Sequence, residues 1–140
     1  MKGRTLVAVS RLSGILALTL AIGCPERRAA WLLEGSTASK IRIGFGHSRG
    51  SREAIDFGSL VVYSCNDSGP HSARMLWAIH GSGESTKLDS VVINVPPNGF
   101  VVAKSVSLPK TGCISVESGA ARLSLQLGED GTVTELRRPR

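Results

Sequence analysis

Apolar and polar residues alternate along much of the chain after residue 24. In residues 40–45, three apolar side chains share one face of an extended chain and two basic side chains share the other. The segment 121–127 repeats this arrangement, with apolar residues at every odd position. A period of two is typical of a strand that buries one face. The pattern therefore predicts strands at 40–45 and 121–127.

Short apolar runs between polar turns predict further strands. Clusters of Gly, Ser, Pro and Asn interrupt the chain at intervals, and these residue types favour turns. No sustained 3.6-residue period is found after residue 24, and residues 51–57 are expected to form at most one helical turn. The further strands are expected at 60–65, 75–79, 91–95, 100–104, 112–118 and 132–136.

About seven to nine short strands predict an all-β protein. Because two packed sheets can each bury one face, strands of this length and spacing favour a β-sandwich. The chain has 140 residues, of which 41% are hydrophobic, which is enough for one core and one domain. We expect the sandwich to occupy residues 29–136.

Residues 1–23 have the pattern of a secretory signal peptide. Basic residues occur up to Arg11, and an uncharged, mostly apolar stretch of about twelve residues follows. A helix that spans a membrane needs about 20 apolar residues, so this stretch is too short. The pattern predicts export of the chain.

The end of this segment resembles the lipobox of bacterial lipoproteins. Gly23 precedes Cys24 directly, and Ala21 and Ile22 stand before them. In that family the peptidase cuts before the cysteine, and lipid is attached to its sulfur. The resemblance implies a membrane anchor at Cys24 and a place in the cell envelope, facing the periplasm or the exterior. Pro25 follows the cysteine, which favours the outer membrane in a cell with two membranes; an ordinary signal peptide with a soluble product remains the alternative.

A lipid at Cys24 leaves residues 24–28 as a short tether. The apolar run 30–33 then has two interpretations. Trp31 could lie at the level of lipid headgroups, or the run could be a first strand packed on the core. We favour the strand. The whole arrangement resembles small bacterial lipoproteins, a likeness that implies no activity.

Two of the three cysteines remain for a disulfide if Cys24 carries lipid. Cys65 and Cys113 are then an even pair in an oxidising compartment. The order Cys65, Trp77, Cys113 also resembles immunoglobulin-like domains, in which a buried Trp packs on a disulfide between the two sheets. That resemblance implies an immunoglobulin-like sandwich.

Positive charge is concentrated at the two ends of the chain. The net charge is +6, but residues 1–23 hold three basic residues and no acid, and the tail 137–140 holds three arginines. Residues 29–136 contain nine basic and ten acidic residues. Nucleic-acid binding needs a clustered basic surface, so no nucleic-acid partner is expected. The basic tail is expected to be attracted to anionic surfaces.

Residues 46–50 match the G-x-S-x-G motif of α/β-hydrolases. That motif needs a strand, a sharp turn and a following helix to present the Ser48 hydroxyl, and residues 51–58 are too short and broken for the helix. The glycines at 44, 46 and 50 also miss the spacing of a dinucleotide-binding loop. We interpret the segment as a polar hairpin loop, with hydrolase activity a minor alternative.

Three further motifs have simpler explanations. Residues 108–112 match the sortase signal LPxTG, but charged residues between 113 and 136 leave no membrane span after it, so we expect a turn into the next strand. His47, His71 and His80 are expected in surface loops, and two cysteines 48 residues apart with scattered histidines predict no metal site. Residues 66–68 fit an N-glycan acceptor, which we take to be a chance match.

The sequence as a whole predicts a lipid-anchored envelope protein with a binding or structural role. No catalytic residue and no cofactor are expected. The second hypothesis is an accessory subunit of a larger envelope complex, which would bind its partner through an exposed strand edge.

Overall fold

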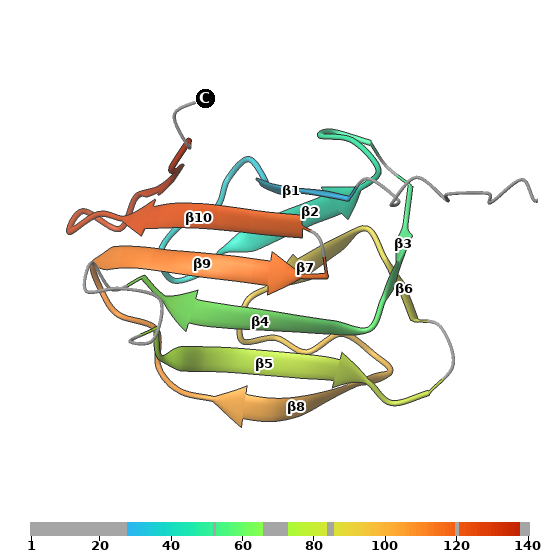
Figure 1. Ribbon diagram of the computed structural model, residues 1–140. Helices are drawn as coiled ribbons and strands as arrows, with labels where there is room; N and C mark the ends of the chain where they lie inside the picture. Colours follow the sequence, from blue (N-terminus) through green and yellow to red (C-terminus); the bar gives the residue numbers. More distant parts are fainter. Residues whose placement is uncertain (1–27, 52, 66–72, 84–85, 120, 138–140) are drawn as a thin grey trace, which may run out of the picture.

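The computed structural model describes residues 28–51, 53–65, 73–83, 86–119 and 121–137 (Figure 1). These residues contain eleven strands and no helix. The strands are β1 (Ala29–Leu32), β2 (Arg42–Gly46), β3 (Ile55–Phe57), β4 (Ser59–Ser64), β5 (Met75–Gly81), β6 (Thr86–Leu88), β7 (Ser90–Val92), β8 (Phe100–Ser105), β9 (Gly112–Ser118), β10 (Ala121–Leu127) and β11 (Val133–Glu135).

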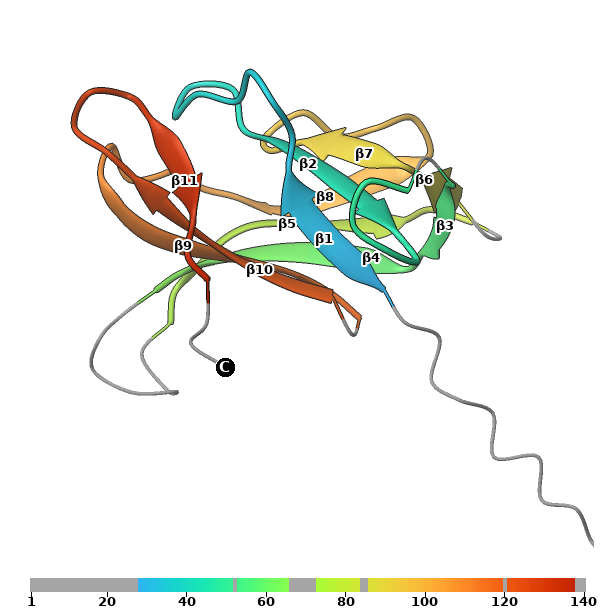
Figure 2. The same cartoon turned by 90° about the horizontal axis from the view of Figure 1, so that it is seen from above.

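The strands form two layers. The front layer in Figure 1 is an antiparallel sheet of six strands in the order β11-β10-β9-β4-β5-β8, and the layer behind it is the sheet β1-β2-β7. Figure 2, seen from above, shows the two sheets face to face. The short ladder of β3 and β6 stands at one end of the molecule. The described part of the chain is therefore an all-β sandwich, as the sequence predicted.

Alternating burial explains why these segments are strands. On β10 the odd positions 121–127 are buried while the even positions face outward, and β3 buries Ile55 and Phe57 on either side of exposed Asp56. Burial of the apolar face stabilises the sheet only if the strand keeps its register. The largest fully buried side chains are Trp77, Phe45, Ile41, Ile43, Leu60, Leu76, Ile79, Ile114, Leu125, Leu127, Val62 and Val116.

Trp31 packs on the backbone of Gly44. The two residues face each other across the β1–β2 ladder, and Trp31 is only 8% exposed. A Cβ placed on Gly44 would lie 2.6 Å from two atoms of the Trp31 ring. Glycine therefore makes room for the indole, and the run 30–33 belongs to a strand on the core rather than to a lipid-facing segment.

The edge of the small sheet at β1 is closed by a side chain from the large sheet. The Leu32 N–H of β1 donates to Glu135 Oε1 of β11 at 2.6 Å. The Arg49 guanidinium, from the loop after β2, donates to both oxygens of the same carboxylate at 2.7 and 3.0 Å. One carboxylate thus joins β1, β11 and the loop 47–50.

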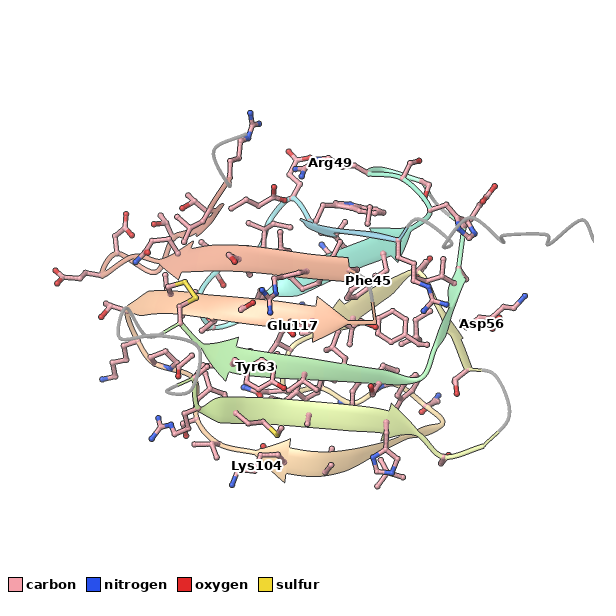
Figure 3. The ribbon with its side chains drawn as sticks, in the orientation of Figure 1. Phe45, Arg49, Asp56, Tyr63, Lys104 and Glu117 are labelled. Atoms are coloured by element: carbon pink, nitrogen blue, oxygen red, sulfur yellow. A yellow bond between two sulfur atoms is a disulfide. The ribbon has the colours of Figure 1, made fainter. Side chains whose placement is uncertain are left out.

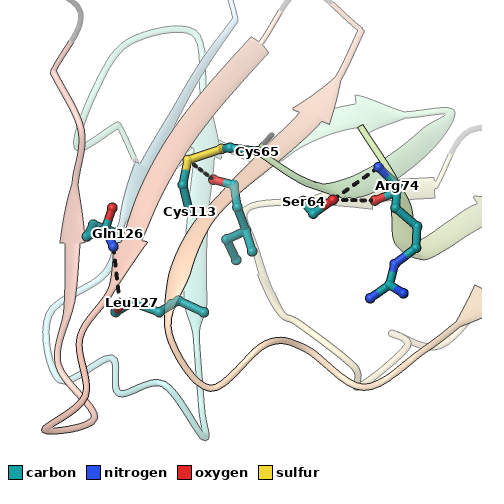
Figure 4. The surroundings of a disulfide bond; sticks show 7 residues. Ser64, Cys65, Arg74, Cys113, Gln126 and Leu127 are labelled. Atoms are coloured by element: carbon teal, nitrogen blue, oxygen red, sulfur yellow. Dashed lines mark hydrogen bonds between the residues drawn. A yellow bond between two sulfur atoms is a disulfide. The ribbon is translucent and has the colours of Figure 1, made fainter. Parts of the chain in front are cut away.

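Cys65 and Cys113 form a disulfide, with their Cα atoms 5.0 Å apart (Figure 4). The pairing agrees with the sequence prediction. Cys65 follows β4 directly and its N–H donates to Cys113 O on β9 at 2.9 Å, and β4 and β9 are neighbours in one sheet. The bridge therefore does not join the two sheets, and in this respect the chain departs from the immunoglobulin arrangement.

The structure corrects two expectations about local structure. Residues 55–57 form strand β3 rather than part of a helical turn, because pairing with β6 lets Ile55 and Phe57 reach the core. His80 lies on strand β5 and not in a loop. The signal segment, Cys24, Asn66–Ser68 and His71 lie outside the described residues.

Candidate binding edge at strand β8

Strand β8 is the outermost strand of the six-stranded sheet at the end opposite β11. It pairs with β5 on one side, and no described strand pairs with its other side. The other edge strands are shorter: β3, β6, β7 and β11 have three residues each and β1 has four, whereas β8 has six. Long free edges expose unpaired N–H and C=O groups that can accept another strand.

Both faces of β8 are open to solvent. Every residue from Val101 to Ser105 is exposed, with Val101 46% and Val102 40% exposed. The register places Val101 opposite exposed His80 and places Val102 opposite buried Ile79, so the two valines lie on opposite faces. The small sheet therefore does not cover the inner face at β8.

The hydrogen-bond register shows which backbone groups face outward. Ser82 N–H donates to Gly99 O and Val106 N–H donates to Leu76 O, and each of these pairs continues the β5–β8 register. In an antiparallel pair, residues whose backbone groups bond to the neighbouring strand alternate with residues whose backbone groups point away from it. Val102 and Ser105 are at the second kind of position, so their backbone groups point away from β5. They are the donors and acceptors that an added strand would use.

An aromatic contact holds one end of β8 in place. The rings of Phe57 and Phe100 meet edge to face, with centroids 6.4 Å apart, and the Phe57 ring meets Phe45 in the same way at 4.6 Å. Such contacts favour one ring arrangement over others. The edge is thus anchored to the core at Phe100 while the rest of the strand is exposed.

Two features of β8 limit uncontrolled pairing. Lys104 is the one charged residue of the strand, and its side chain belongs to the outer face of the sheet (Figure 3). The register shifts between Ala78 and Ile79, so that β8 contains a bulge. Lysine and bulges are the usual means by which edges avoid aggregation. These two features therefore disfavour indiscriminate pairing of β8 with other strands.

The G-x-S-x-G segment does not form a nucleophile elbow. Ser48 is exposed in a loop closed by the hydrogen bond from Ser51 N–H to Ser48 O at 3.0 Å. The next element along the chain is strand β3, where an elbow needs a helix. The loop is instead held to β11 through Arg49 and Glu135.

The carboxylate of Glu135 is electrostatically stabilised at this contact. Burial is the largest influence and on its own would raise the pKa of the carboxyl. Hydrogen bonds from Arg49 and from Leu32 N–H, with the positive charges of Arg49 and Arg137, outweigh burial, so the pKa lies below its ordinary value. Glu135 therefore has a structural role as an ionised group.

The remaining sequence motifs occupy ordinary positions. In the LPxTG match, Gly112 begins β9 with a φ of 106°, which favours glycine, so the segment is a turn into a strand as predicted. His47 follows β2 and His80 lies on β5. The described residues contain no group of three His, Cys, Asp or Glu side chains able to hold a metal, and they contain no helix long and apolar enough to cross a membrane.

Sequence reasoning predicted a strand at 100–104 but did not identify it as the open edge. One feature of the sequence did indicate an open edge. The four residues Phe100 to Ala103 are all apolar and show no alternation, which is unusual for a strand that buries one face against a second sheet.

Comparison with protein-family models, with curated protein sequences and with solved structures finds no match to this chain.

Proposed function

We propose that this chain is a cell-envelope protein that binds a protein partner by accepting an extended segment of that partner beside β8. In this proposal the chain catalyses no reaction. Lipid on Cys24 holds the sandwich at the membrane, on the periplasmic or outer side, with the outer membrane favoured in a cell that has two. The chain thereby serves as a binding module or as an accessory subunit of a larger envelope complex.

The free edge of β8 is the observation that carries the binding proposal. Its six residues form the longest edge strand of the described part, and Val102 and Ser105 direct backbone groups away from β5. Strand addition takes its affinity from main-chain hydrogen bonds and its specificity from alternate side chains. Val101 on the outer face and Val102 on the inner face provide apolar contacts on both sides of an added strand.

The charge of the edge indicates the chemistry of the partner. Lys104 lies on the outer face at the far end of β8 from Phe100. An acidic residue opposite Lys104 would pair with it, and opposite charges across a strand pair stabilise it. The proposed partner segment is therefore extended and apolar, with one carboxylate near Lys104.

The anchor is supported by the sequence alone. The apolar stretch before Cys24 is too short to span a membrane, and its last residues resemble a lipobox. Two acyl chains give stable anchoring where one is marginal. Replacing Cys24 by Ser should move the protein out of the membrane fraction, and mass spectrometry should find lipid on the mature N-terminus; an unlipidated N-terminus at another residue would overturn the anchor.

Site-specific photocrosslinking in intact envelopes tests the binding edge. A photoreactive residue at Ala103 should give a protein adduct of one defined mass, and the same residue at exposed Thr134 on β11 is the matched control. Val102→Pro should abolish the adduct, since proline removes an outward N–H without breaking the β5–β8 ladder. Val102→Thr keeps the N–H and should preserve it. An adduct that survives Val102→Pro in a protein of unchanged melting temperature would exclude strand addition.

A further inference from the structure

We infer that the side of the sandwich formed by β1, β10 and β11 faces the membrane and binds anionic phospholipid headgroups in a groove between β1 and β10. This inference extends the proposed anchoring to a second site on the body of the protein. It rests on where the described chain begins and ends, on the composition of the groove, and on the strand order. Each of these is independent of the β8 edge.

The groove lies where the chain enters and leaves the sandwich. It has a volume of about 430 Å³ and is lined by Arg28, Ala29, Ala30, Arg122, Leu123, Ser124 and Leu136. Arg28 is the first described residue and Leu136 is the last but one.

The length of the tether places the groove near the membrane. Cys24 is four residues before Arg28. Four extended residues span about 14 Å at most. A lipid attached at Cys24 would therefore hold Arg28 within that distance of the bilayer surface, and the groove that Arg28 lines would lie next to the headgroups.

The groove combines positive charge with apolar surface. Two of its residues carry guanidinium groups, and the Ala29, Ala30 and Leu136 side chains form an apolar lining with Leu123. Guanidinium binds phosphate oxygens in a two-pronged arrangement, while the apolar lining suits the glycerol and upper acyl region of a lipid. The groove therefore fits the headgroup region of a phospholipid.

Both arginines of the groove have partners within the protein. Arg122 pairs with Glu117, and the Arg122 side chain is still 53% exposed. Arg28 donates to the backbone oxygen of Asp56 at 3.0 Å. Glu135, near the tail, is engaged by Arg49. The last four residues of the sequence are three arginines and one proline, with no acid.

The proposed orientation also determines where the free edge of β8 lies relative to the membrane. β10 and β11 lie at one edge of the six-stranded sheet and β8 lies at the other. If β1, β10 and β11 face the membrane, β8 faces away from it. The free edge is then open to partners in the aqueous space.

Lipid photocrosslinking of the protein isolated from its native envelope tests the inference. The protein is reconstituted with phosphatidylcholine vesicles that contain or lack phosphatidylglycerol. A photoreactive residue at Leu136, in the groove, should give phospholipid adducts mainly with phosphatidylglycerol present. The photoreactive residue placed instead at Val101 on β8 should give few lipid adducts. The native side chains at the two positions are almost equally exposed, 43% for Leu136 and 46% for Val101.

Charge variants supply the second readout. Arg28→Gln and Arg122→Gln should each reduce the Leu136 adduct about fivefold, since each arginine at an anionic surface contributes about 1 kcal/mol. Arg122→Lys keeps the charge but not the two-pronged geometry and should retain part of the adduct, and Lys104→Gln on β8 should leave the adduct unchanged. Deleting residues 137–140 should reduce the adduct and leave the melting temperature nearly unchanged, because the tail follows the last strand.

The outcomes separate this inference from the proposed anchor. Adducts that form equally at positions 101 and 136, or that do not depend on phosphatidylglycerol or on the two arginines, would overturn the groove as a headgroup site even if Cys24 is lipidated. If Cys24 carries no lipid, the anchor fails, but the groove should still give phosphatidylglycerol adducts when vesicles are added to the soluble protein.

Discussion

Arg49 and Glu135 lie 86 residues apart in the sequence and form a salt bridge with two hydrogen bonds, at 2.7 and 3.0 Å. Arg49 is 63% exposed whereas the Glu135 side chain is 16% exposed. Glu135 also accepts the N–H of Leu32. The glutamate is therefore the central residue of the contact, because it accepts hydrogen bonds from both the loop 47–50 and β1.

Replacing Glu135 by Gln should lower the free energy of unfolding by about 1–2 kcal/mol at neutral pH, since hydrogen bonds to a charged group are lost. The pKa of Glu135 is lowered in the folded protein, so its ionisation stabilises the fold above the ordinary pKa of 4.5. This stabilisation is lost as pH falls through the lowered pKa. Urea unfolding across this pH range should show the wild-type and variant curves converging under acidic conditions.

Two variants serve as controls for this prediction. Arg49→Ala removes an exposed partner and should cost at most about 1 kcal/mol. Glu129→Gln changes an exposed carboxyl in the turn before β11 and should change stability by less than about 0.5 kcal/mol. A difference between the Glu135→Gln and wild-type proteins that stays constant down to strongly acidic pH would contradict the role of ionised Glu135.

Gly44→Ala should destabilise the sandwich by about 1–3 kcal/mol, because its methyl group would overlap the Trp31 ring in a packed core. Gly58→Ala is the matched control, since a Cβ there meets no atom within 4 Å, and it should be nearly neutral. Thermal unfolding of both variants measures the effect. A Gly44→Ala protein as stable as Gly58→Ala would show that the indole is not seated on the glycine.

The Cys65–Cys113 disulfide closes a loop across 48 sequence positions and should stabilise the domain by about 4 kcal/mol on the chain-entropy view. That is a large share of the 5–15 kcal/mol typical of a domain. Cys65→Ser/Cys113→Ser protein should unfold at much lower urea concentration. Thiol counting on the denatured, unreduced protein exported by its native route should find neither cysteine free; two free thiols would refute the bridge.

Ser48→Ala should have no effect on labelling by a broad fluorophosphonate probe. Ser48 is exposed in a loop followed by a strand, so it lacks the helix that a nucleophile elbow requires. The measurement is gel fluorescence of the probe-treated wild-type and variant proteins. Labelling of the wild type that disappears in the variant would restore the hydrolase hypothesis.

Local pattern determined which segments became the longer strands. Period-two alternation placed β10 at 121–127, a short apolar run between turns placed β9 at 112–118, and the structure has the same bounds. Strands β3 and β6 were not predicted. They pair only because the chain brings Ile55 and Phe57 to the core, and that is a tertiary effect.

The sequence by itself determined the all-β class and the turns, since these follow from local periodicity and residue conformational preference. Tertiary structure alone decided that β8 is the free edge, that Arg49 meets Glu135, and that the disulfide joins neighbours within one sheet. The residues of a strand determine which of its faces is buried. Which strands become its neighbours depends on how segments far apart in the sequence pack together to cover the core. The candidate binding edge and the groove beside Arg28 depend on that choice.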